Sequence, residues 1–189
     1  GTFIGLLTPY PLLVGVTTVA LFMMHGAIYG VMKTEGELHD KLRLWAMRCI
    51  IFFVICAVTL TMSTLLYVPH MTARVHANPW LFSIALANML AIANIPREFH
   101  HKRDGFAFLS SCAAMITLMA LFALNIFPDM IYSLPDPGNS LTIYNAASSQ
   151  KTLGIMLIIA CIGVPIVIAY TVCIYWIFRG KVKLDRMSY

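Results

Sequence analysis

Charged side chains are scarce in this sequence and are absent from long stretches of it. They make up 11% of the 189 residues, whereas a soluble domain usually carries about 25%. A charge in the middle of a bilayer costs several kcal/mol, and about 20 helical residues cross hydrocarbon about 30 Å thick. Five runs of suitable length contain no Asp, Glu, Lys or Arg: residues 11–32, 50–68, 79–95, 106–127 and 153–178. The sequence therefore predicts an integral membrane protein.

The predicted fold class is all-α, with transmembrane helices over about 11–33, 42–68, 79–95, 106–127 and 150–179. Short loops between antiparallel neighbours favour an up-down four-helix transmembrane bundle, with the last span as one peripheral transmembrane helix. We expect a single domain with three parts. Residues 1–127 form a four-helix transmembrane repeat, residues 128–147 an extracytoplasmic loop, and residues 148–189 a peripheral transmembrane helix with a cytoplasmic tail.

Individual residues set the predicted helix ends. Asp40 is a plausible N-cap for the second helix, and Pro96 should end the third because proline cannot donate to the helical ladder. Ser148 or Ser149 should cap the last helix, which Pro165 should kink. Among the turn residues, Pro135-Asp-Pro-Gly138 should reverse the chain sharply.

Basic residues are distributed unevenly between the two sides of the predicted bundle. Two of the 13, Arg74 and Lys151, fall on one side, and the other eleven lie in the first loop, the third loop and the C-terminal tail. The positive-inside rule then places the N-terminus outside and the C-terminus in the cytoplasm. Topology and contact with anionic lipid account for the net charge of +5, so it calls for no nucleic-acid partner.

The sequence also lacks the residue groups that carry most enzyme chemistry. It has no C-x-x-C pair, no P-loop and no G-x-S-x-G, and no carboxylate lies within a predicted span. The loop histidines, 39, 70, 76, 100 and 101, do not show zinc-ligand spacing. We therefore expect no catalytic residue and no metal site in this chain.

His25 is the one ionisable imidazole inside a predicted span. It is a candidate haem or metal ligand or a member of a proton relay, or else a neutral side chain hydrogen-bonded to a backbone carbonyl or to an Asn on another helix. No second histidine lies within a span to complete a bis-histidine site. Directly after His25, Gly26 and Gly30 form a G-x-x-x-G pair that allows another helix to approach closely.

Two stretches of the chain resemble a known family. The first reads Pro128-Asp-Met-Ile-Tyr-Ser133, then Asn139-Ser-Leu-Thr-Ile-Tyr-Asn-Ala-Ala-Ser-Ser-Gln-Lys-Thr-Leu153, then Val164-Pro-Ile-Val-Ile-Ala-Tyr-Thr171. The second includes Gly26-Ala-Ile-Tyr29 and Lys33-Thr-Glu-Gly-Glu-Leu-His39. The chain is similar over almost all its length to the C-terminal half of subunit II of the cytochrome bd quinol oxidases. The resemblance marks these residues as structural family positions: Gly26, Gly36, Glu37, Leu38, Ser140, Leu141, Thr142, Ala147, Ser148, Ser149, Thr152, Leu153, Pro165, Tyr170 and Thr171.

The resemblance implies a function that composition does not. Oxidases of this family transfer electrons from quinol to O2, form water and contribute to the proton gradient. Haem b and haem d belong to subunit I, against which subunit II packs as a haem-free partner that scaffolds it and, in some members, holds a structural quinone. The expected partners are subunit I, the N-terminal half of subunit II with its proton-path carboxylates, small accessory subunits and the bilayer of a bacterial cytoplasmic (inner) membrane.

Two alternatives belong to other classes of protein. The first is a b-type haem electron carrier that uses His25, although the resemblance places no family haem ligand at that position. The second is a small membrane transporter, for which interrupted helices and a charged midplane site would be typical. Pro165 is the only clear interruption within a span, and no charged midplane site is visible.

Overall fold

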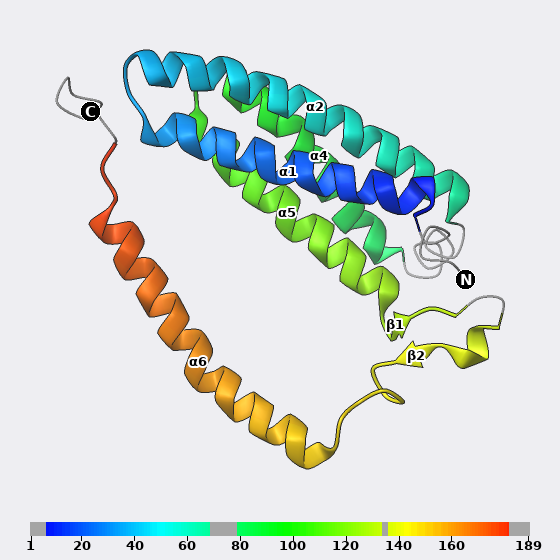
Figure 1. Ribbon diagram of the computed structural model, residues 1–189. Helices are drawn as coiled ribbons and strands as arrows, with labels where there is room; N and C mark the ends of the chain where they lie inside the picture. The colour runs from blue at the N-terminus through cyan, green and yellow to red at the C-terminus, as the bar shows by residue number, and fades with distance from the viewer. Residues whose placement is uncertain (1–6, 69–78, 134–135, 182–189) are drawn as a thin grey trace. The chain divides into compact units, whose positions relative to one another are not determined.

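The computed structural model describes residues 7–68, 79–133 and 136–181. Within them, five helices are long and apolar enough to cross a membrane, which confirms the predicted all-α fold class (Figure 1). The chain divides into two compact units, one comprising Gly1–Asn125 with Lys181–Tyr189 and the other Ile126–Gly180. Each is described by itself. The predicted outer loop over residues 69–78 lies outside the described residues.

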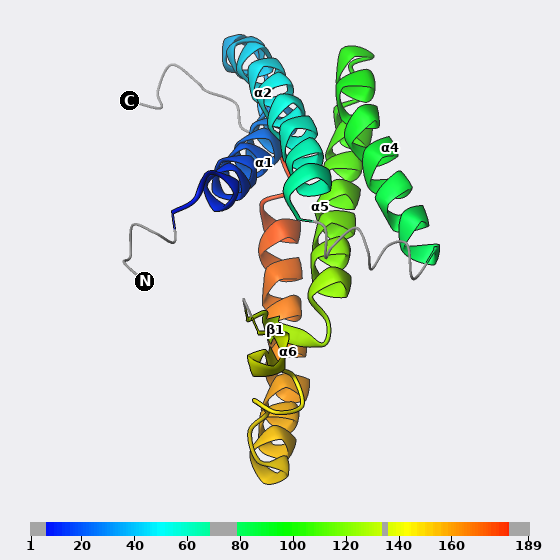
Figure 2. The same ribbon diagram turned by 90° about the vertical axis from the view of Figure 1, so that its right-hand side faces the viewer.

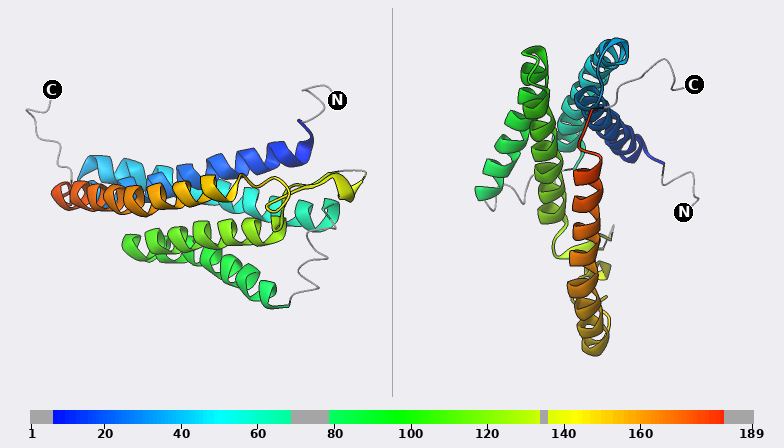
Figure 3. Two further views of the ribbon diagram at one scale, coloured as in Figure 1. Left: turned by 90° about the horizontal axis from the view of Figure 1, so that it is seen from below. Right: turned by 90° about the vertical axis from the view of Figure 1, so that its left-hand side faces the viewer.

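The first unit contains helices α1 (Pro9–Lys33), α2 (Glu37–Tyr67), α4 (Trp80–His100) and α5 (Asp104–Ile126). α1 and α2 lie side by side (Figures 1 and 2). α4 and α5 lie close together near the turn that joins them and diverge away from it (Figures 2 and 3). The turn between α1 and α2 is tight because Gly36 adopts φ +70°, a left-handed conformation that glycine reaches without steric cost.

Two predicted helix ends are wrong. α2 begins at Glu37 with Gly36 as its N-cap, so Asp40 lies inside the helix rather than capping it. α4 continues through Pro96 to His100. Proline removes one backbone donor, but the turn that follows buries Glu98 and Phe99. Burial of an aromatic side chain contributes about 2 kcal/mol, which offsets much of the cost of about 3 kcal/mol for a proline inside a helix.

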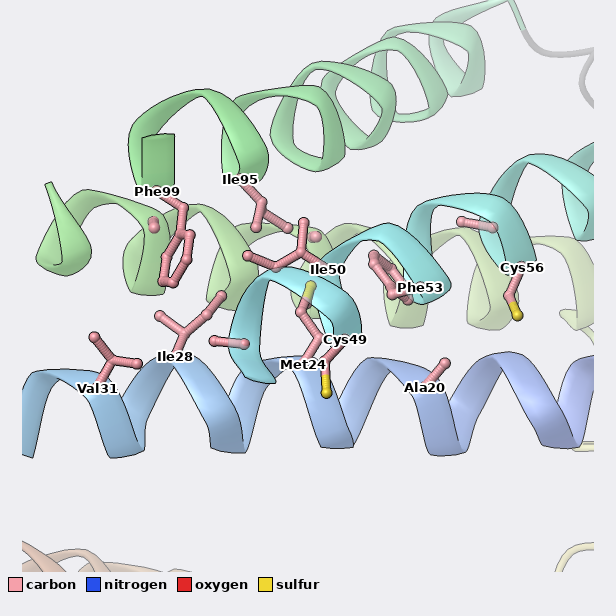
Figure 4. Close-up of a cluster of buried hydrophobic side chains, with 14 residues drawn as sticks. Ala20, Met24, Ile28, Val31, Cys49, Ile50, Phe53, Cys56, Ile95 and Phe99 are labelled. Carbon is pink, nitrogen blue, oxygen red and sulfur yellow. The ribbon is translucent and has the colours of Figure 1, made fainter. Parts of the chain in front are cut away.

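Apolar side chains at helical spacing form the core of the first unit. The buried residues of α1 recur every three or four positions and face the buried side chains of α2, while α4 adds two more (Figure 4). The labelled members are Ala20, Met24, Ile28, Val31, Cys49, Ile50, Phe53, Cys56, Ile95 and Phe99. Because lipid is as apolar as these side chains, close packing rather than exclusion of water holds the helices together.

The second unit consists of a short hairpin and one long helix. Strands β1 (Asp129–Ile131) and β2 (Leu141–Thr142) pair antiparallel, with a 3-10 turn, η2 (Pro137–Asn139), between them. The hairpin was not predicted. Of the predicted reversal at Pro135-Asp-Pro-Gly138, residue 135 lies outside the described residues, and Pro137 and Gly138 fall in η2 between the two strands. α6 (Gln150–Ile177) has 28 residues, none of them buried, and Pro165 lies in its interior. Whether Pro165 kinks α6 stays a prediction.

Candidate functional site

His25 lies where α1 meets α5. Its Nδ1 is 2.8 Å from Ser111 Oγ, and its ring stacks on Phe108 with centroids 4.6 Å apart. Ser111 is fully buried and donates its hydroxyl hydrogen to Phe108 O at 2.7 Å, so the imidazole donates from Nδ1. His25 is therefore hydrogen-bonded, as one of the two interpretations predicted. Its partner is a hydroxyl on another helix rather than a backbone carbonyl or an Asn.

Two polar pairs join α4 to α5. Thr117 Oγ1 donates to Asn88 Oδ1 at 3.0 Å, and Asn94 Nδ2 donates to Ser110 Oγ at 2.9 Å. A hydrogen bond between membrane helices contributes about 0.6 kcal/mol on average. The asparagines stand out in the sequence as amides in or near a span, but nothing in the sequence identifies their partners.

Arg43 joins three helices at one end of the bundle. Arg43 belongs to α2. Its Nη1 donates to Oδ1 and Oδ2 of Asp104 in α5 at 2.9 and 3.1 Å. Its Nη2 donates to Phe99 O of α4 at 2.6 Å. The guanidinium also lies over the Phe99 ring, 4.6 Å from its centroid. The Arg43 and Asp104 side chains are only 21% and 19% exposed, and charge-assisted hydrogen bonds of this kind are among the stronger ones in proteins.

Sequence reasoning missed the role of Arg43 because it counted this residue only as one of the basic residues that set topology. One signal was available. Asp104 is an isolated carboxylate at the start of a span, on the same predicted side of the membrane as Arg43. A charge placed next to hydrocarbon usually has a partner.

The family positions in the second unit build its turn. Ser140 is buried, its Oγ accepts from Ser133 N at 3.1 Å and its carbonyl accepts from Asn145 Nδ2 at 3.0 Å. Asn145 Oδ1 in turn accepts from Thr142 N at 2.7 Å, while Thr142 Oγ1 accepts from Asn145 N at 3.1 Å. Asn145, absent from the predicted set of family positions, is therefore at the centre of this network.

Ser149 caps α6, which settles the choice left open between Ser148 and Ser149. Its Oγ accepts from Thr152 N at 3.3 Å and lies 2.9 Å from Thr152 Oγ1. Leu153 N donates to Ser149 O at 3.0 Å. Serine is a favoured N-cap because its hydroxyl satisfies a backbone donor of the first turn.

The remaining predicted residues do not gather into one site. A Cβ on Gly30 would contact Leu42 Cδ1 of α2 at 3.6 Å, whereas Gly26 has nothing within 4 Å, so only Gly30 borders a helix contact within the described residues. Glu37 forms an exposed ion pair with Lys41 at 2.7 Å. The others are spread along the chain: Leu38 half-buried in α2, Ala147 and Ser148 exposed before α6, and Pro165, Tyr170 and Thr171 exposed on α6.

Cation-binding side chains are dispersed in the same way. Within residues 7–68, 79–133 and 136–181, no three of His, Cys, Asp and Glu come together as possible metal ligands. His70 and His76 lie outside the described residues. The fold and its polar contacts therefore define a multi-pass α-helical membrane protein whose helices are joined by hydrogen bonds and by the partly buried Arg43–Asp104 ion pair.

Comparison with known proteins identifies the family within this class. The family of cytochrome bd terminal oxidase subunit II matches residues 1–178, so the chain belongs to that family. It is 31% identical to cytochrome bd-I ubiquinol oxidase subunit 2 of Escherichia coli (strain K12), over 100% of this chain and 56% of that protein.

Two further relatives agree. The probable cytochrome oxidase subunit 2 of Haemophilus influenzae is 30% identical over 98% of this chain and 56% of its own length. Cytochrome bd ubiquinol oxidase subunit 2 of Bacillus subtilis (strain 168) is 26% identical over 95% and 53%. The chain thus spans little more than half the length of these relatives.

Proposed function

We propose that this chain is a haem-free, structural part of a terminal quinol:O2 oxidoreductase in a bacterial inner membrane. The observation that carries this proposal is the family match over residues 1–178, together with five apolar helices that can cross a bilayer. Its partners are a haem-bearing subunit I, the rest of subunit II, small accessory subunits and the lipid. The complex oxidises quinol and reduces O2 to water.

The contacts within the first unit support a scaffolding role. Arg43 connects α2 to α4 and α5, and the Asn88–Thr117 and Asn94–Ser110 pairs connect α4 to α5. Each contact fixes the position of one helix relative to another. A subunit of this kind presents a rigid surface to its partner and leaves electron transfer to the partner's haems.

His25 provides the test of whether this chain could hold a haem itself. Its Nδ1 donates to Ser111, the orientation in which the other ring nitrogen could ligate a metal. A low-spin b-type haem needs a second axial ligand, however, and the predicted spans contain no second imidazole. These residues therefore do not fit a bis-histidine haem, and the haem b and haem d of the family are assigned to the partner. A structural quinone or lipid remains the ligand proposed for this subunit.

The orientation forms part of the proposal. With the turn at 101–103 and the Arg43–Asp104 pair in the cytoplasm, the basic residues Arg97, Lys102 and Arg103 lie on the inner side, as the positive-inside rule requires. The N-terminus of the chain is then outside and the C-terminus is cytoplasmic. A cysteine introduced into the turn at 101–103 would test this arrangement. A membrane-impermeant thiol reagent should label it from the cytoplasmic side of the membrane and not from the outer side.

A difference spectrum tests the proposed function. Dithionite-reduced minus oxidised absorption is recorded for the chain purified alone and for the complex that it co-purifies with. Haem b and haem d bands in the complex alone, unchanged per complex by His25→Ala, support the proposal. A b-type band in the isolated chain that His25→Ala removes contradicts it and favours the electron-carrier alternative.

A further inference from the structure

The C-terminal half of α4 carries a groove whose lining includes Asn94, the residue that also bonds to Ser110 of α5. It has a volume of about 440 Å³ and is lined by Leu90, Ala91, Ala93, Asn94 and Arg97. The groove is hollow because two alanines lie between the longer side chains of Leu90 and Arg97. The apolar part of the lining, from Leu90 to Ala93, rises about 5 Å along the helix, and the guanidinium of Arg97 begins about 6 Å further on.

The charge at this end of the groove is positive and exposed. Arg97 and Arg103 lie 4.0 and 3.9 Å from opposite oxygens of the buried Glu98 carboxylate, at the limit of ion-pair distance. Their side chains are 71% and 66% exposed. One carboxylate therefore faces two guanidiniums, Lys102 adds a further positive charge nearby, and Asp104 is already paired with Arg43.

Asn94 holds the guanidinium at the mouth of the groove. Its Nδ2 donates to Ser110 Oγ of α5 at 2.9 Å, which fixes the orientation of the Asn94 amide. Its Oδ1 accepts from Arg97 Nη1 at 3.4 Å. That single long contact uses one of the five N–H donors of the guanidinium. The fork that remains matches the geometry of a phosphate group, which arginine binds through two parallel hydrogen bonds.

We propose that this groove binds an anionic phospholipid, with an acyl chain along Leu90–Ala93 and the phosphate at Arg97. Charge complementarity selects this occupant. A zwitterionic lipid has no net negative charge to offset the excess of arginine over carboxylate, and a quinone head group has no charge at all. The inference rests on the proposed function, whose lipid ligand it specifies by class and by site, but its failure would leave the haem-free role tested by the difference spectrum unaffected.

Photolabelling in nanodiscs tests the proposal on the full chain. The protein is reconstituted in phosphatidylcholine with a small fraction of phosphatidylglycerol carrying a diazirine on its acyl chain, and labelled peptides are mapped by mass spectrometry. We expect adducts on residues 90–97 that unlabelled phosphatidylglycerol competes away and phosphatidylcholine does not. Because a basic side chain near the surface contributes about 1 kcal/mol to anionic lipid binding, Arg97→Gln should lower labelling about fivefold.

A second variant separates the shape of the groove from its charge. Ala93→Leu fills the floor and keeps every charge, and it should lower labelling of residues 90–97 to a similar extent. Arg48→Gln removes an exposed arginine from α2 and Ala160→Leu enlarges an exposed alanine of α6, and both should label like the original chain. Equal labelling by a diazirine phosphatidylcholine, or full labelling of both Arg97→Gln and Ala93→Leu, would overturn the proposal.

Discussion

The two units of this chain are built by different means. In the first, four helices share a buried core and side chains distant in sequence meet, as His25 and Ser111 do across 86 positions. In the second, no residue of α6 is buried, and the contacts that shape its turn are local, as between Ser133 and Ser140. A long apolar helix satisfies its own backbone in lipid. The first unit is therefore specified by side-chain contacts, whereas α6 is specified by apolar composition and by its cap.

Loss of Arg43 should have the largest effect, because it breaks the contact that joins three helices. Arg43→Ala leaves Asp104, 19% exposed, without its cation and Phe99 O without its donor. Removing one member of such a pair should lower the free energy of unfolding by about 2–3 kcal/mol. Equilibrium unfolding in mixed micelles measures the difference.

The exposed ion pair on the same helix supplies the control for Arg43. Lys41 lies 2.7 Å from Glu37, but the two side chains are 71% and 84% exposed, and solvated pairs contribute little. Lys41→Ala should change stability only slightly. If Arg43→Ala and Lys41→Ala lower the free energy of unfolding equally, the partly buried Arg43–Asp104 pair stabilises the first unit no more than an exposed ion pair does.

Overpacking should separate the two units directly. Ala114 of α5 is fully buried in the core, so Ala114→Leu must displace its neighbours and should cost about 2 kcal/mol. Ala160→Leu makes the same change on α6, where the residue is exposed, and should leave the free energy of unfolding nearly unchanged. A similar loss for both would mean that α6 packs as tightly as the bundle does.

The contact between His25 and Ser111 should have a smaller effect. A double-mutant cycle with His25→Ala and Ser111→Ala isolates their interaction, which we expect to be about 1 kcal/mol, within the range measured between membrane helices. A coupling energy near zero would mean that the 2.8 Å contact does not contribute to stability. The Asn88–Thr117 pair provides a second cycle of the same kind.

The sequence predicts the spans of this fold better than the contacts between them. Absence of charge located all five helices because the cost of a charge in hydrocarbon depends on composition alone. The end of α4 was wrong because the burial of Phe99, a tertiary effect, overrode the local preference of Pro96. The partner of His25 was beyond prediction for a related reason: which hydroxyl faces the ring depends on how α1 is rotated against α5. Ser149, by contrast, was among two predicted caps, since capping depends on residues within one turn.

The smallest predicted effect concerns this cap, which is the clearest local determinant of the second unit. Ser149→Ala removes the acceptor of Thr152 N, and for an exposed cap the cost is about 0.5 kcal/mol. A loss of this size barely alters global unfolding, so hydrogen–deuterium exchange over residues 150–153 is the more sensitive measurement. Ser148→Ala changes the exposed neighbour and should leave exchange as it was. Faster exchange confined to this first turn would show that α6 depends on its cap locally, whereas faster exchange throughout α6 would show that the cap sets the stability of the whole helix.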